Sequence, residues 1–147
     1  MKKILFILFA IQFLFGSCDK WPENGDLDGM WQLMEISHDG TKSDMKAERL
    51  FCSFQLKVFM LGSKTAGGRA YFGYFEHTDD MIRFHHFTFR SQYTEDANID
   101  KLMTDEDLDR IRPWGFYSID SRYKIEELTG NSMILIHEQD TLKWRKY

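Results

Sequence analysis

The chain has little cysteine and no surplus of positive charge, and both shortages exclude classes of function. Its 147 residues include two cysteines, Cys18 and Cys52, too few for a structural zinc site built from cysteine ligands. Nineteen lysines and arginines stand against 23 aspartates and glutamates, for a formal net charge of −4. Acidic chains of this kind are poorly suited to binding nucleic acid or to gripping anionic lipid through a basic patch.

The sequence also lacks the motifs of nucleophilic catalysis. It contains no Gly-x-Ser-x-Gly, no Ser/Lys pair and no Cys/His arrangement typical of a nucleophile. The glycine-rich stretch over residues 62–68 lacks the Gly-Lys-Ser/Thr ending of a phosphate-binding loop. No acid–base pair can be named, so an enzyme is the least supported class. We predict a protein with no catalytic residue and no cofactor.

No grouping of histidine and acidic residues predicts a metal site. His85 and His86 are neighbours on an expected strand, so we expect them to point to opposite faces and not to chelate one ion together. The acidic residues of 105–109 lack the glycine and the alternating ligand spacing of a calcium loop. They fit a solvated helix start instead. We therefore predict that the protein binds no metal.

The first residues have the order of a secretory signal peptide. Lys2 and Lys3 precede an apolar run over residues 4–15, and Gly16 and Ser17 supply the small residues of a cleavage point. The apolar run is too short to cross a bilayer as a helix. We predict that residues 1–17 are removed, which leaves 17 basic and 23 acidic side chains and a net charge of −6.

Cys18 follows this segment directly. Residues 15–18, Phe-Gly-Ser-Cys, resemble a bacterial lipobox, which implies acylation of Cys18 and stable anchoring in a membrane of the cell envelope, facing the periplasm or the cell surface. The alternative is an ordinary secretory signal with an incidental cysteine. With Cys18 acylated, Cys52 has no intramolecular partner, so a disulfide framework is excluded and stability must come from packing. Residues 18–28 are expected to form a flexible tether.

The rest of the chain predicts an all-β domain with one short helical insert. Alternation is clearest over residues 50–61, where one face contains Leu50, Cys52, Phe54, Leu56, Val58 and Met60. Further strands are expected over residues 30–37, 69–78, 81–90, 114–119, 123–128, 133–138 and 141–147. Thr104 is expected to cap a short helix that Pro113 ends. About eight antiparallel strands suffice to close a small barrel.

A tight turn at residues 79–80 predicts which side chains face the barrel interior. It would place Tyr74 opposite His85, Phe72 opposite Phe87 and Glu76 opposite Arg83. On the outer face we then expect Tyr71, Phe75, Phe84 and His86. A ligand-binding interior would be lined by Phe54, Leu56, Phe72, Tyr74, His85 and Phe87.

The start of the first strand carries a family resemblance. Residues 29–31, Gly-Met-Trp, resemble the opening motif of lipocalins and of small bacterial lipocalin-like lipoproteins. The resemblance implies an up-and-down barrel of about eight strands over residues 29–147, with Trp31 closing its floor and Gly29 admitting the entering chain. It also implies a basic residue of the last strand over Trp31. Arg145 and Lys146 are the counterparts, and we favour Arg145 because a guanidinium can stack on indole.

Two functions stay open from the sequence. The first is a lipid-anchored, non-enzymatic envelope protein that holds a small hydrophobic or amphipathic ligand in the barrel. The second is an accessory envelope lipoprotein with a filled barrel, which binds a protein or glycan partner through its surface. In both, the chain contacts the membrane through Cys18 and does not bind nucleic acid.

Overall fold

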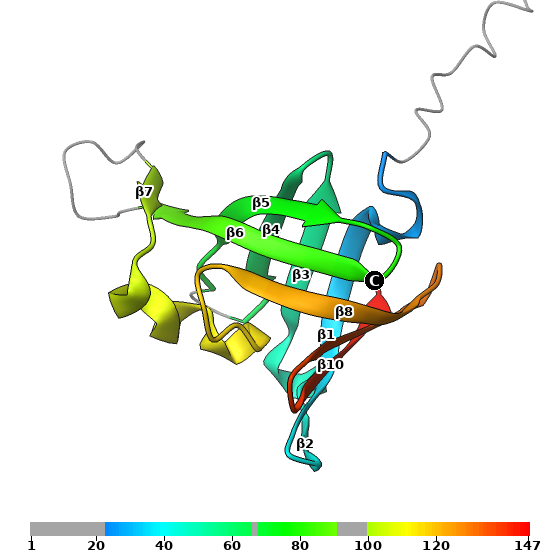
Figure 1. Cartoon of the computed structure of the whole chain (residues 1–147). Helices are drawn as coiled ribbons and strands as arrows, with labels where there is room; N and C mark the ends of the chain where they lie inside the picture. The colour runs from blue at the N-terminus through cyan, green and yellow to red at the C-terminus, as the bar shows by residue number, and fades with distance from the viewer. Residues whose placement is uncertain (1–22, 66–67, 91–99) are drawn as a thin grey trace, which may run out of the picture.

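The computed structural model describes residues 23–65, 68–90 and 100–147. Its central feature is a closed ring of eight antiparallel strands (Figure 1). The ring consists of β1 (Gly29–His38), β3 (Leu50–Gln55), β4 (Val58–Ser63), β5 (Tyr71–His77), β6 (Met81–Arg90), β8 (Ser121–Leu128), β9 (Ser132–His137) and β10 (Asp140–Lys146). Each strand pairs with the next in this order, and β10 pairs back with β1. The predicted eight-stranded up-and-down barrel is confirmed.

Short elements extend this ring without entering it. The strand β2 (Thr41–Asp44) pairs with the end of β1, and β7 (Asp100–Leu102) pairs with the end of β6. The helical turns of the described residues are 3-10 helices, namely η1 (Gly25–Leu27), η2 (Lys46–Glu48), η3 (Asp105–Arg110) and η4 (Arg112–Trp114). Within the described ranges, no helix has the length and apolar character needed to cross a bilayer.

The strand predicted over residues 50–61 is two strands joined by a hairpin turn. Leu56 has a left-handed φ of 57°, and Gln55 pairs with Val58 across the turn. Phe54 and Phe59 are therefore opposite each other and both are buried. The turn shifts the alternation by one residue, so Leu56, Val58 and Met60 are exposed. The prediction that all six even-numbered residues share one face is wrong from Leu56 onward.

The helical insert is partly as predicted. Thr104 and Asp107 form a capping box that begins η3. Pro113 does not end the helical segment but lies in the first turn of η4. The strand predicted over residues 114–119 is not formed, because those residues continue from η4 into turns. The barrel closes without it since β6 pairs directly with β8, with Ile82 opposite Tyr123.

The register of β5 and β6 was predicted correctly near the turn, but the face assignment is reversed on β5 and on β6 up to His85. Tyr74 is opposite His85 and Glu76 is opposite Arg83, as expected. A bulge follows, with His86 at a left-handed φ of 53°, and it pairs Phe72 with Thr88 instead of Phe87. Contrary to the prediction, Tyr71, Phe75 and Phe84 are buried and Tyr74 is exposed, while the bulge turns Phe87 to the interior where it was expected.

The floor of the barrel is built around Trp31, which is fully buried. Its indole N–H donates to the Leu27 carbonyl at 2.8 Å, so η1 covers the ring. Lys146 lies opposite Trp31 in the β1–β10 pair, with its ammonium 4.9 Å from the ring centroid, and donates to the Asp26 carbonyl at 2.7 Å. At Gly29, whose φ is +114°, an added Cβ would lie 3.2 Å from Lys146. Little room is left for a side chain there.

The basic residue over Trp31 is therefore Lys146, and the preference for Arg145 is wrong. Arg145 is exposed and donates to the Gln32 side-chain oxygen at 3.3 Å. The reason is register, because the residue paired with Trp31 shares its side of the sheet whereas the preceding residue points to the other side.

The two neighbouring cations allow a direct test of the floor. Lys146→Met removes the contact with Trp31 and leaves the Asp26 carbonyl without its donor, so we expect a loss of about 1–2 kcal/mol in the free energy of unfolding. Arg145→Met removes one long hydrogen bond, 3.3 Å to Gln32, from an exposed side chain, so it should cost less than Lys146→Met, about 0.5 kcal/mol. Urea denaturation of both variants measures the difference, and equal losses would contradict the assignment of Lys146.

Candidate ligand-binding site

The barrel interior is occupied by the protein's own aromatic rings. Phe59 lies at the centre, with ring centroids 5.1 Å from Phe84 and 5.0 Å from Phe87 in edge-to-face arrangements. Phe54 packs on Phe75 at 5.0 Å in the same manner. Such contacts are the preferred geometry of aromatic pairs. Rings in mutual contact along the axis leave the centre of the barrel filled with side chains.

The segment after η4 closes the mouth of the barrel from inside. Phe116 is fully buried and contacts Phe84 at 4.9 Å and Phe87 at 5.3 Å between centroids. Gly115, with a φ of +88°, turns the chain inward, and its carbonyl accepts from the Tyr123 hydroxyl at 2.8 Å. Burial raises the pKa of Tyr123 well above its usual range, so this hydroxyl stays a donor. The sequence did not predict that Phe116 fills the barrel mouth, because a strand was expected over these residues. We call this segment the stopper.

The six residues predicted to line a ligand cavity do not come together. Phe54 and Phe87 are buried in the interior. Leu56 and Tyr74 are 59% and 52% exposed, and Phe72 faces outward beside Met60. His85 is the cross-strand partner of Tyr74 and therefore faces outward on the same side of the sheet. The interior position is wrong for Leu56, Phe72, Tyr74 and His85, owing to the hairpin turn at Leu56 and the reversed face of β5 and β6.

His85 and His86 lie on the same side of the sheet, contrary to the prediction. Their Nδ1 atoms are 2.6 Å apart, and the ring centroids are 4.9 Å apart. The left-handed backbone of His86 turns its ring back toward His85 and Tyr74. Among the described residues, no group of three histidine, cysteine or acidic side chains could hold a metal ion. Cys52 is buried, and burial raises the pKa of its thiol.

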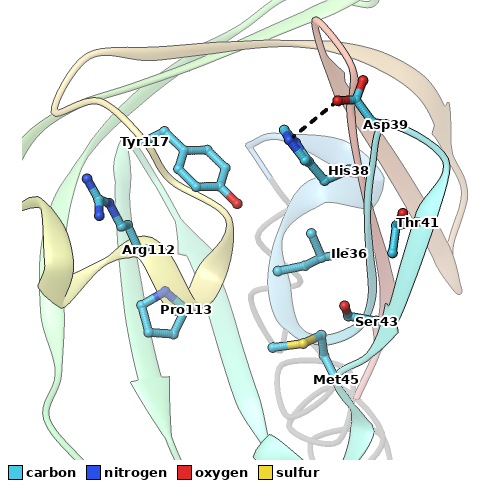
Figure 2. Close-up of a pocket in the computed structure, with 9 residues that line it drawn as sticks. All are labelled: Ile36, His38, Asp39, Thr41, Ser43, Met45, Arg112, Pro113 and Tyr117. Atoms are coloured by element: carbon cyan, nitrogen blue, oxygen red, sulfur yellow. Dashed lines mark ion pairs between the residues drawn. The ribbon is translucent and has the colours of Figure 1, made fainter.

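An open groove of about 660 Å³ lies at the end of the barrel opposite η1, where β1 runs into β2 (Figure 2). Its lining residues are Ile36, His38, Asp39, Thr41, Ser43, Met45, Arg112, Pro113 and Tyr117. Figure 2 shows Arg112, Pro113 and Tyr117 facing the side formed by β1 and β2. Sequence reasoning did not find this groove because residues 36–45 and 112–117 meet only through tertiary packing.

The groove combines an apolar base with ionisable groups. Ile36, Met45 and Pro113 supply its apolar lining. Arg112 is 56% exposed and forms an ion pair with Asp109 at 2.9 Å. Burial raises the pKa of the Tyr117 hydroxyl, which stays protonated at neutral pH. A groove of this composition can hold an amphipathic molecule, with polar groups placed near the guanidinium and the hydroxyl.

His38 gives the groove a charge that depends on pH. Its Nδ1 lies 2.5 Å from a carboxylate oxygen of the largely buried Asp140, and its Nε2 lies 3.7 Å from Asp39. The hydrogen bond to Asp140 is the main cause of a raised His38 pKa, and the charge of Asp140 adds to it. The imidazolium is therefore held in the folded protein at pH values where a free histidine would lose its proton.

The filled interior predicts that two glycines differ strongly in how well they tolerate substitution by alanine. A Cβ on Gly73 would lie 2.6 Å from the Phe59 ring and 2.9 Å from the His85 carbonyl oxygen, whereas a Cβ on Gly62 meets nothing within 4 Å. Gly73→Ala should lower the free energy of unfolding by about 1–3 kcal/mol through overpacking. Gly62→Ala should leave it unchanged or raise it by about 0.5 kcal/mol. Urea denaturation compares them, and equal tolerance would contradict a filled interior.

The His38 pair predicts a pH dependence with a defined sign. Since the folded protein holds the His38 proton more tightly than the unfolded chain, this contribution to stability is complete below the ordinary pKa of 6.5 and is lost as pH rises through the raised value. A proton NMR titration should show the raised pKa. Asp140→Asn should lower it more than Asp39→Asn does, because Asp140 supplies the hydrogen bond. The reverse order would refute the pairing.

Comparisons with known proteins agree with the architecture. A family model described as a lipocalin-like domain matches residues 13–147. The crystal structure of a lipocalin-like protein from Bacteroides uniformis superposes with a TM-score of 0.62 at 24% identity, covering 84% of this chain and 100% of that one. An uncharacterized protein from Bacteroides eggerthii gives a TM-score of 0.61 at 24% identity, with 82% and 99% covered. No curated protein gives a significant match.

The resemblance carried by residues 29–31 is thus confirmed at the level of the family. The two solved structures establish the shared fold, and the family model covers nearly the whole chain. A lipocalin-like fold is typical of binding domains, in which a small set of positioned side chains selects the ligand. The family match, together with the closed eight-stranded ring and the Trp31 floor, shows that the chain belongs to the lipocalin-like domain family.

Proposed function

We propose that this protein is a lipid-anchored binding protein of the cell envelope, without enzymatic activity, that takes a small amphipathic ligand in the groove between β1, β2 and η4. The observation that carries the proposal is the contrast between the two candidate sites. The interior around Phe59 is packed with rings, while the groove is open and has both apolar and charged lining. Ligand sites commonly combine an apolar surface with a few placed polar groups.

The anchor in this proposal is Cys18, acylated after removal of residues 1–17. The first packed residues follow soon afterwards, with Leu27 fully buried under the floor. The end of the barrel that bears η1 would then lie nearer the membrane, and the groove, at the opposite end of the barrel (Figure 1), would be open to the periplasm or the outside of the cell. A ligand or an envelope partner such as a glycan could reach this end without passing the bilayer.

One observation favours a second candidate, a small polar ligand inside the barrel. The indole N–H groups of Trp31 and Trp114 donate to backbone carbonyls at 2.8 Å and 3.1 Å. The Trp144 N–H is buried and has no acceptor among the described residues. A buried donor without an acceptor is costly, so a bound group that accepts from Trp144 would be stabilised. This site and the groove can be distinguished experimentally.

The test is native mass spectrometry of the chain purified gently from its own host, with variants of two adjacent residues of β2. Ser43 lines the groove, and Lys42 precedes it in β2 without lining the groove. We expect the wild-type protein to release a small molecule on denaturation. Ser43→Trp should fill the groove and lose that molecule, whereas Lys42→Trp should retain it.

Each other outcome has a defined meaning. A molecule retained by Ser43→Trp and lost on Trp144→Phe would move the site to the interior. A bare polypeptide that stays bare after incubation with envelope lipid and glycan extracts would contradict small-molecule binding. It would favour the other function open from the sequence, a surface that binds an envelope protein.

A further inference from the structure

We infer that the outer face of β4 and β5, together with the β3–β4 turn, is a membrane-contacting surface that lies on the bilayer holding the Cys18 anchor. This inference rests on the lipid anchor of the proposed function and adds an orientation to it. The surface is called the β4–β5 patch and consists of Leu56, Val58, Met60, Phe72 and Tyr74.

The β4–β5 patch is contiguous and apolar. Leu56 is 59% exposed and Tyr74 is 52% exposed, with Val58 and Met60 at 40% and 36%. Val58 is directly opposite Tyr74, and Met60 is directly opposite Phe72. Side chains opposite each other on one face are in contact range, so these four residues form one surface, and Leu56 lies in the hairpin turn that precedes Val58. Continuous apolar surface of this kind marks an interaction site, unlike isolated exposed residues.

The chain from the anchor reaches the barrel at this patch. The Asn24 side-chain amide donates to the Leu56 backbone carbonyl at 2.8 Å and to Asp28 at 2.6 Å. Its backbone N–H donates to Asp28 at 3.1 Å. Leu27, three residues later, is fully buried. The point where the chain joins the domain is thus fixed to the apex of the β3–β4 turn, at the end of the barrel where η1 lies (Figure 1).

The linking chain is too short to hold the patch far from lipid. Cys18 and Asn24 are six residues apart, and six residues span at most about 22 Å when fully extended. The acyl chains on Cys18 must lie in the bilayer, so the Leu56 turn stays within that distance of its surface. A patch held beside a membrane at a high local concentration will bind it even when its intrinsic affinity is low.

The composition of the patch matches a lipid interface. Leu56 at the turn apex is flanked by the neutral Gln55 and by Lys57, whose ammonium can pair with lipid phosphates while Leu56 enters the acyl boundary. Tyrosine, as at Tyr74, is enriched at the level of the lipid head groups. The patch ends at Glu76, which pairs with Arg83 at 3.6 Å and forms a polar border. Interfacial apolar groups insert by about 5–10 Å.

The test measures the depth of two labelled positions in the full acylated chain. Leu56→Cys and the control Lys42→Cys each introduce one accessible thiol, since Cys18 is acylated and Cys52 is buried. The two positions have similar exposure, 59% for Leu56 and 63% for the Lys42 side chain, but Lys42 lies on β2 at the opposite end of the barrel. Each variant carries an environment-sensitive fluorophore and is reconstituted into phosphatidylethanolamine and phosphatidylglycerol vesicles, with or without doxyl-labelled phospholipid.

We expect the label at residue 56 to shift to shorter wavelength and to be quenched by the doxyl lipid, and the label at residue 42 to show neither effect. A label at Tyr74→Cys should behave as at residue 56. Flotation of the protein with the vesicles and the mass of the peptide that contains Cys18 report separately on the anchor. If the protein floats but both labels stay in water, the patch inference is overturned and the anchor stands.

Two further results would also overturn the inference. A chain whose Cys18 carries no acyl groups and that does not float would remove the anchor and the orientation that depends on it. A label at residue 56 that shifts without doxyl quenching, and only at high protein density on the vesicle, would show that a second copy of the chain covers the patch.

Discussion

The packing of Phe59 at the centre of the barrel is the constraint on which the rest of the domain depends. Its ring contacts Phe84 and Phe87 edge to face, and it takes the space that a side chain at residue 73 would need. Gly73 is therefore a requirement of the core and not of a turn, since its backbone does not need positive φ. With a ring at this position, the strands around it can close into a narrow barrel only if the interior holds side chains and no large ligand.

Because the interior is filled, the open site is the groove at the end of the barrel, lined by the end of β1 together with β2 and the chain around η4. The same stretch that closes the mouth, with Phe116 buried inside, also supplies Arg112, Pro113 and Tyr117 to the groove at that end of the barrel. The stopper and the groove wall are thus one piece of chain, held by the hydrogen bond from Tyr123 to Gly115 and by that from Trp114 to Phe51. A rigid wall favours selectivity, because little ordering of the protein is needed when a ligand binds.

The sequence predicted the barrel because the features that define it are local. Turn residues at 79–80, the Gly29 to Trp31 opening and the Thr104 cap each act over a few positions. The residues that line the interior were harder to predict. Alternation along a strand shows that its two faces differ, but not which face is inside when both are aromatic. Two non-glycine residues in left-handed backbone, Leu56 and His86, also changed the alternation. Leucine does not signal that conformation, and the enrichment of histidine there is too weak to locate a bulge. The groove joins distant segments and had no local signal.

The two ends of the barrel differ in a way that follows from where β1 begins and ends. At Gly29 the chain enters under Trp31, where Lys146 ties η1 to the last strand, so the incoming segment has a fixed direction. At His38 the same strand reaches the groove. The ten residues of β1 therefore connect the end of the barrel that we propose to lie near the membrane with the end that we propose to bind the ligand. Since β1 pairs with both β3 and β10, it cannot tilt independently of the barrel. Contact of the β4–β5 patch with lipid would thus fix the direction in which the groove opens, without any contact between the two sites.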